Sequence, residues 1–223
     1  MHDIFIIYIC VHQYNRNIHL NIRTIRMKLS DAKKDYYRKL AKDHGYRSRS
    51  AYKLEQLNNS YHILRPSYKV IDFGCAPGGW LQVILNEIGP GGKVIGIDIQ
   101  DIKPISGAII LCADIEDHTV TDEILRLLNS KADIALSDLA PNVSGIWDID
   151  HARQISLTRS AFTIAQKVLK KSGSAIFKVF EGELLNELKL DLKNSFHKVI
   201  VSKPHASRQE SSEIYLVCLQ FNG

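Results

Sequence analysis

The sequence has no apolar run that approaches the length of a membrane span, and we do not expect a secretion signal. The N-terminal stretch Ile4–Val11 is apolar over only eight residues, whereas a transmembrane helix needs about 20. No basic stretch precedes it and no small-residue cleavage site follows it, so it is not typical of a signal peptide. We therefore expect a cytoplasmic protein that does not bind a membrane.

Cysteine is scarce and shows no pairing pattern. The four cysteines, at positions 10, 75, 112 and 218, form no C-x-x-C pair and no zinc-ligand spacing. This usage favours reduced thiols, agrees with a cytoplasmic location and predicts no bound metal.

Both common phosphate-binding glycine signatures are also missing. The stretch KVIDFGCAPGGWLQ (69–82) places glycines at 74, 78 and 79, after an apolar run that ends at Asp72. A P-loop requires lysine after its last glycine, but Trp80 and Leu81 follow Gly79. The dinucleotide spacing G-x-G-x-x-G does not fit either, and no cation lies near the loop to hold a pyrophosphate.

What the sequence contains is one domain and a distinct N-terminus. With 223 residues, of which 45% are apolar, the chain can bury a sizeable core. We interpret 27–223 as a single domain whose first part, 27–60, is a basic helical segment. Residues 1–26 differ in character. Because Met27 opens a stretch that resembles a natural chain start, a misassigned start codon would explain the difference; an exposed N-terminal extension or an added strand is the alternative.

From Lys69 onward, β-rich runs alternate with helical patterns. This alternation predicts an α/β fold with a mostly parallel sheet and helices on both faces. The runs expected as strands are 69–73, 93–98, 108–114, 133–138, 173–180, 197–203 and 213–221. The helical patterns cover 78–88, 121–129, about 150–170 and about 183–194.

The positive charge is concentrated in residues 27–53, which carry nine Lys or Arg and three Asp. Four tyrosines are interleaved with these cations. Basic and aromatic side chains together are typical of an RNA-binding surface, although a solvated helix face is the alternative. The expected RNA contacts, with three additions near the C-terminus, are Lys33, Lys34, Arg38, Lys39, Lys42, Arg47, Arg49, Lys203, His205 and Arg208.

Acidic residues stand at or next to the ends of four predicted strands: Asp72, Asp98, Asp114 and Asp138. In such sheets, ligands bind at the carboxyl ends of the strands. Asp98 is placed to accept hydrogen bonds from both hydroxyls of a ribose, and Asp114 is placed to accept one from an adenine amino group. A positively charged adenosine without phosphate fits best, and this predicts S-adenosylmethionine as the cofactor. A plain tight turn with acidic caps is the alternative.

Five sequence blocks give a specific resemblance. In order, they are RSRSAYKLEQL (47–57), DFGCAPGGW (72–80), SDLAPNVSG (137–145), FKVFEGE (177–183) and KPHASRQESSEIYLV (203–217). With these blocks, the chain resembles the FtsJ/RrmJ family of RNA ribose 2′-O-methyltransferases from about residue 35 to 219. The resemblance implies a Rossmann-like S-adenosylmethionine-dependent methyltransferase fold with seven strands, the last antiparallel.

The resemblance also implies a catalytic tetrad: Lys53, Asp138, Lys178 and Glu213. Lys178 would be the base that removes the proton of the ribose hydroxyl, oriented by Asp138 and Glu213. Because a sulfonium methyl is already activated, no metal is needed. The resemblance places the cofactor on the glycine loop and the strand-end acids: Asp72, Gly74, Gly78, Gly79, Trp80, Asp98, Asp114 and Asp138.

The expected partner is RNA, and the enzyme is expected to be a monomer. Within the family, the blocks SDLAPNVSG and SSEIY resemble the large-subunit rRNA enzymes, which implies a uridine in the A-loop of 23S rRNA as the target. The basic front end resembles the tRNA anticodon-loop enzymes and leaves that loop as the alternative. Two other classes remain: an RNA-binding module without catalysis, and a small-molecule methyltransferase or NAD oxidoreductase. The intact tetrad argues against the first, and the basic segment with the missing dinucleotide fingerprint argues against the second.

Overall fold

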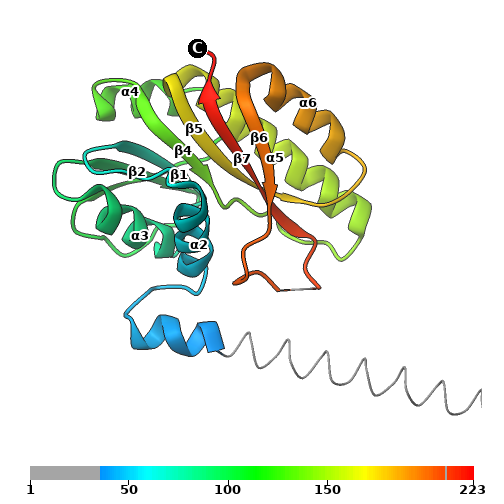
Figure 1. The fold of residues 1–223 in the computed structure, drawn as a ribbon, viewed down its shortest axis with the longest axis horizontal. Helices are drawn as coiled ribbons and strands as arrows, with labels where there is room; N and C mark the ends of the chain where they lie inside the picture. Colours follow the sequence, from blue (N-terminus) through cyan, green and yellow to red (C-terminus); the bar gives the residue numbers. More distant parts are fainter. Residues whose placement is uncertain (1–35, 209) are drawn as a thin grey trace, which may run out of the picture.

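The computed structural model describes residues 36–208 and 210–223, and Figure 1 shows a central sheet flanked by helices. The strands are β1 (Lys69–Phe73), β2 (Lys93–Asp98), β3 (Ala108–Cys112), β4 (Ala132–Ser137), β5 (Leu169–Phe180), β6 (Phe196–Ser202) and β7 (Glu213–Phe221). The helices are α2 (Ala51–Tyr61), α3 (Gly79–Ile88), α4 (Val120–Leu128), α5 (Trp147–Val168) and α6 (Leu185–Ser195). Residues 36–43 form a further helical stretch. The extension 1–26 and the expected RNA contacts Lys33 and Lys34 lie outside the described residues.

The seven strands form one sheet in the order β3-β2-β1-β4-β5-β7-β6. β1 pairs in parallel with β2 and β4, and β4 pairs in parallel with β5. β7 runs antiparallel between β5 and β6. The expected mostly parallel sheet with an antiparallel last strand is confirmed. β4 is buried along its whole length, as parallel strands covered on both faces are.

Helices α2 and α3 cover one face of the sheet. Leu54 and Leu57 of α2 and Leu81 and Ile84 of α3 belong to one buried apolar cluster. This cluster continues along β7 through Tyr215 and the residues that follow it on the same face. The side chains of α2 therefore lie over the strands that carry the last two tetrad residues.

The other face is covered by α4, α5 and α6, and Figure 1 shows α5 and α6 on the side of β6 and β7. Ile124, Phe162 and Leu188 come from these three helices and share a second buried cluster. Helices on both faces agree with the α/β prediction. No helix within 36–208 and 210–223 is both long and apolar enough to cross a bilayer.

The strand order reverses at β1, which lies between β2 and β4. The chain first builds β1, β2 and β3 outward on one side and then crosses to begin β4 on the other. Crevices form at such reversal points, outside the carboxyl ends of the strands. Asp72, Asp98 and Asp138 therefore lie around one end of the sheet.

Candidate active site

The four tetrad residues come together at the carboxyl end of β4 and β5. In the register of β5 with β7, Lys178 lies directly opposite Tyr215, so both side chains point to the same face. The ammonium nitrogen of Lys178 is 2.6 Å from the backbone oxygen of Asp138 and 3.3 Å from its Oδ1. The side chain of Lys178 is almost fully buried, so the surrounding strands fix its position.

Lys53 reaches the same place from the first turns of α2. Its Nζ donates to Oε1 of Glu213 at 2.5 Å, across 160 residues of sequence. The side chains of the pair are only 10% and 14% exposed. Ser207 donates a further hydrogen bond to Oε1 of Glu213 at 3.1 Å. The carboxylate of Glu213 is thus held by two donors from different parts of the chain.

Tyr215 is a fifth member of this cluster that the sequence reasoning missed. Its buried hydroxyl donates to Oδ1 of Asp138 at 3.0 Å and lies 3.2 Å from Oε1 of Glu213. The ring packs against Trp80, with centroids 5.9 Å apart. Strand alternation gave the signal for this role, since residues 213 and 215 must point to the same face of β7.

Burial and charge act in opposite directions on the carboxylate of Glu213. Burial raises its pKa, but the ammonium groups of Lys53 and Lys178 together lower the pKa by more than burial raises it. The net result is a pKa below the ordinary value. For Tyr215, burial and the two neighbouring carboxylates, Asp138 and Glu213, all raise the pKa of the phenol well above its usual value. The phenol therefore stays protonated and acts as a hydrogen-bond donor.

A cavity of about 360 Å³ lies beside the tetrad at the carboxyl ends of the strands. The described residues that line it include four acids and no lysine, arginine or histidine: Asp98, Asp114, Glu116 and Asp138. Asp98 accepts hydrogen bonds from the backbone N–H groups of Ala76 and Gln100, both at 2.9 Å. Three of the four sequence-predicted acids, Asp98, Asp114 and Asp138, therefore line one cavity.

Asp72 lies beneath this cavity rather than in its wall. The side chain is completely buried, and neither carboxylate oxygen has a hydrogen-bond partner among the described residues. Burial, together with the nearby carboxylates of Asp138 and Asp98, raises the pKa of Asp72 well above its usual value. Such a buried carboxylate without a partner is costly, and a positive charge nearby would offset part of this cost.

The glycine loop is shaped by two different neighbours. Gly74 lines the cavity with φ of +79°, and a Cβ there would come within 3.0 Å of the backbone of Leu139. A Cβ at Gly78 would instead meet Ile105 first and then Arg47, and a Cβ at Gly79 would meet Ser48. Trp80 donates from Nε1 to the backbone oxygen of Ser50 at 2.9 Å. Direct cofactor contacts of these last three loop residues stay a prediction.

The hydrogen-bond acceptors in the cavity wall fit an adenosine ligand that carries a positive charge. Its carboxylates can accept hydroxyl and amino protons, and they would repel a phosphate. Behind the wall, burial and the neighbouring carboxylates raise the pKa of Asp72, and a positively charged ligand in the cavity would favour its ionised form. The cavity volume lies within the range of small-molecule sites.

The expected RNA contacts are spread along one edge of the site. Arg38, Lys39 and Lys42 are exposed on the helical stretch 36–43, and Arg49 lies near Arg208. Burial and the charge of Arg208 lower the pKa of Arg49, and the carboxylate of Glu213 opposes this effect only in part.

Two of the expected RNA contacts already have protein partners. Arg47 donates to the carbonyl oxygens of Pro77, Lys103 and Pro104, at 3.3, 2.5 and 2.8 Å. Lys203 donates to the carbonyl oxygen of Ser211 at 2.6 Å. Arg47 thus fastens the loop 103–104 to the glycine loop, and a role in RNA contact stays a prediction for both.

Curated relatives carry one common name, ribosomal RNA large subunit methyltransferase E. The protein of Nitrosopumilus maritimus is 50% identical over 197 residues, which cover 88% of this chain and all of the relative. The protein of Cenarchaeum symbiosum is 46% identical with the same coverage. That of Methanothrix thermoacetophila is 47% identical over 84% of this chain and 72% of its own.

Solved structures of rRNA methyltransferases are also similar to this chain. A ribosomal RNA methyltransferase of Plasmodium falciparum superimposes with a TM-score of 0.72 at 35% identity, covering 80% of this chain and all of the other. An rRNA methylase of Clostridium thermocellum, at 16% identity and a TM-score of 0.51, shares the fold. The family model described as FtsJ-like methyltransferase matches residues 46–221. The chain therefore belongs to the FtsJ-like methyltransferase family.

Proposed function

We propose that this enzyme transfers a methyl group from S-adenosylmethionine to a ribose 2′-hydroxyl of RNA. The observation that carries the proposal is the placement of Lys178, a buried amine beside Asp138, at the edge of an acidic cavity without cations. One end of this arrangement suits a charged adenosine ligand, and the other end suits removal of a hydroxyl proton.

The cofactor would be held by the acids around the cavity. Asp98 would accept the ribose hydroxyls of the cofactor, and Asp114, whose Oδ1 already accepts from the N–H of Glu116 at 2.9 Å, would accept an adenine amino group. Asp138 would face the charged amino acid end, with Asp72 buried behind the wall. When bound, the sulfonium group would supply a methyl group that is already activated for displacement.

The proton of the ribose hydroxyl would pass to Nζ of Lys178. Only the neutral amine has the lone pair for this, and the backbone oxygen of Asp138, 2.6 Å away, accepts one of its N–H bonds and fixes its direction. Lys53 and Glu213, 2.5 Å apart, would position the target ribose. General base catalysis of this kind is worth about 10²–10⁴-fold.

The favoured substrate is large-subunit ribosomal RNA, with a uridine of the A-loop as the target nucleotide. The names of the curated relatives support an rRNA substrate. The exposed cations of 36–43, with Arg49 and Arg208, would hold the phosphates. A tRNA anticodon loop remains the second candidate because of the basic front end of the chain.

Mapping of 2′-O-methyl groups tests this function. Purified enzyme, S-adenosylmethionine and unmodified large-subunit rRNA or tRNA are incubated, and protected ribose positions are read by alkaline hydrolysis. We expect one new protected position in the A-loop. A mark in the tRNA anticodon loop would favour the second candidate, and methyl transfer to a base or to no RNA would contradict the proposal.

A further inference from the structure

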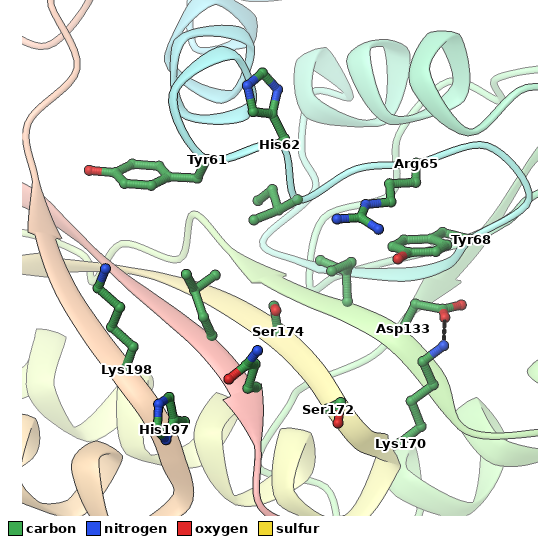
Figure 2. Close-up of a pocket in the computed structure, with 14 residues that line it drawn as sticks. Tyr61, His62, Arg65, Tyr68, Asp133, Lys170, Ser172, Ser174, His197 and Lys198 are labelled. Atoms are coloured by element: carbon green, nitrogen blue, oxygen red, sulfur yellow. Dashed lines mark ion pairs between the residues drawn. The ribbon is translucent and has the colours of Figure 1, made fainter.

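A second hollow lies at the opposite end of the sheet from the acidic cavity. Its volume is about 350 Å³, and its walls come from the end of α2, the segment before β1 and the strands β4, β5, β6 and β7. Figure 2 shows Tyr61 and Lys198 on one side of the hollow, and Arg65 with Tyr68 on the other. None of the tetrad residues lines it.

The charge of this hollow is opposite to that of the acidic cavity. Its wall carries the cations Arg65, Lys170 and Lys198 but only one acid, Asp133. Asp133 is already engaged, because it forms an ion pair with Lys170 and accepts a hydrogen bond from the backbone N–H of Lys69 at 2.7 Å. The two cations that remain leave a net positive wall suited to an anion.

The remaining polar groups of the wall are available to a ligand. The side chains of Arg65, Lys198 and Tyr61 have no hydrogen-bond or ion-pair partner among residues 36–208 and 210–223. Both cations are exposed, and Tyr61 is partly exposed. Tyr68 is used differently, since its ring lies under the ammonium group of Lys170 at 5.4 Å.

The hollow lies on the same face of the sheet as the catalytic cluster. Tyr215 and Leu219 are four residues apart on β7 and belong to the same buried cluster, which corresponds to about 14 Å along the strand. Lys53 and Tyr61 are eight residues apart on α2, or about 12 Å along the helix. The hollow and the catalytic cluster are therefore separated by a distance that a few nucleotides of extended RNA can span, and the RNA would pass over the outer surface of the residues that cover β7.

We propose that this hollow is a second RNA subsite that takes one unpaired nucleotide of the substrate strand. The phosphates that flank the nucleotide would lie near Arg65 and Lys198, and its base would stack against Tyr61. Cations with an aromatic ring are the combination that holds single-stranded RNA. The volume suits one nucleotide rather than a duplex. The inference rests on the proposed function, since it takes RNA as the substrate.

Charge reversal tests the two phosphate contacts. Arg65→Glu and Lys198→Glu should each raise the Kd for an rRNA stem-loop with single-stranded flanks by about fivefold or more, and each should reduce the salt slope of log Kd by about 1. Lys193→Glu, an exposed lysine on α6 at the other face, is the matched control and should change little. Equal Kd values for all three variants and wild type would overturn the subsite.

Substitutions of Tyr61 test the stacking contact. Tyr61→Ala should weaken RNA binding by roughly fivefold or more, while Tyr61→Phe keeps the ring and should bind as wild type does. Uridine monophosphate is the probe for a free nucleotide. If it fills the hollow at micromolar concentration while the variants bind RNA normally, the hollow is a mononucleotide site and the RNA subsite is wrong.

Methylation kinetics separate failure of the subsite from failure of the proposed function. The variants should raise KM for RNA but leave kcat at saturating RNA and the affinity for S-adenosylmethionine unchanged. If wild-type enzyme methylates no RNA ribose, the proposed function fails, and the Kd values still decide whether the hollow binds RNA. If wild type methylates and the variants match it in KM, only the subsite is wrong.

Discussion

The hydroxyl of Tyr215 donates a hydrogen bond of 3.0 Å to Oδ1 of Asp138, and the same hydroxyl lies 3.2 Å from Oε1 of Glu213. A hydroxyl has only one proton, so it serves one of these carboxylates at a time. Asp138 is paired with Lys178 and Glu213 with Lys53. Tyr215 therefore links the two ion pairs into one network.

Tyr215→Phe should uncouple the two pairs without changing the packing of the ring. Loss of a buried hydrogen bond to a carboxylate should cost about 1.5–3 kcal/mol, and kcat should fall about tenfold or more, with KM for RNA unchanged. Thermal melting and steady-state kinetics measure both effects. Tyr36→Phe, at an exposed ring, is the control. A kcat equal to wild type would show that the link has no catalytic role.

Glu213→Gln should lower the free energy of unfolding relative to wild type, and this loss should be larger at neutral pH than at acid pH. The pKa of Glu213 is lowered in the folded state, so its stabilisation is complete above the unfolded value of about 4.3 and is lost as pH falls through the folded value. The amide leaves Lys53 buried and unpaired, at a cost of about 3 kcal/mol or more.

Urea unfolding of both proteins at pH 7 and near pH 3 checks this prediction. The difference in free energy of unfolding should be large at pH 7 and should shrink as pH falls below the unfolded value of about 4.3, because the unfolded chain of the wild type then binds a proton at Glu213. A difference that stays constant between the two pH values would contradict the ion-pair account.

Asp72→Asn should stabilise the ligand-free enzyme and weaken the binding of the cofactor. Because burial raises the pKa of Asp72, its stabilising effect is complete only below the ordinary value and is lost as pH rises through the folded value. Removing the charge should therefore raise the melting temperature by a few degrees at pH 8, with little change at pH 4. Calorimetric titration should show at least about tenfold weaker binding of S-adenosylmethionine. Unchanged affinity would show that Asp72 does not face the ligand charge.

The salt dependence of RNA binding tests whether the cations of 36–43, with Arg49 and Arg208, hold RNA phosphates. Affinity for rRNA should fall steeply between 50 and 200 mM salt, on the order of 10³-fold if about six phosphates are held. Arg49→Ala and Arg208→Ala should each reduce the salt slope by about 1, while Lys193→Ala on α6 should not. A flat salt response of wild-type enzyme would contradict this surface.

Sequence patterns predicted most of the fold because its strands are short apolar runs between turn residues. KVIDF (69–73) is buried at four of its five positions, and this local signal needs no knowledge of the partner strands. The antiparallel direction of β7 was different. Its pairing with β5 and β6 joins distant segments, and only the family resemblance implied it.

The residues of the candidate site could be predicted where a charged side chain stands in an unusual place in the sequence. A lysine in the apolar strand GSAIFKVF and an acid at each strand end stand out in the sequence. Arg47 does not, because its carbonyl partners lie 30–57 residues away. Gly78 and Gly79 were expected to approach a ligand, yet what they approach first is Ile105 and Ser48, respectively, contacts that no local pattern encodes.

Single-turnover methylation by Lys178→Ala tests the central claim most directly. The account predicts that the variant binds S-adenosylmethionine and RNA with wild-type affinity but transfers the methyl group at least about 10²-fold more slowly. If Lys178→Ala transfers methyl to the ribose at a rate near that of wild type, Lys178 is not the base and the proposed mechanism is wrong.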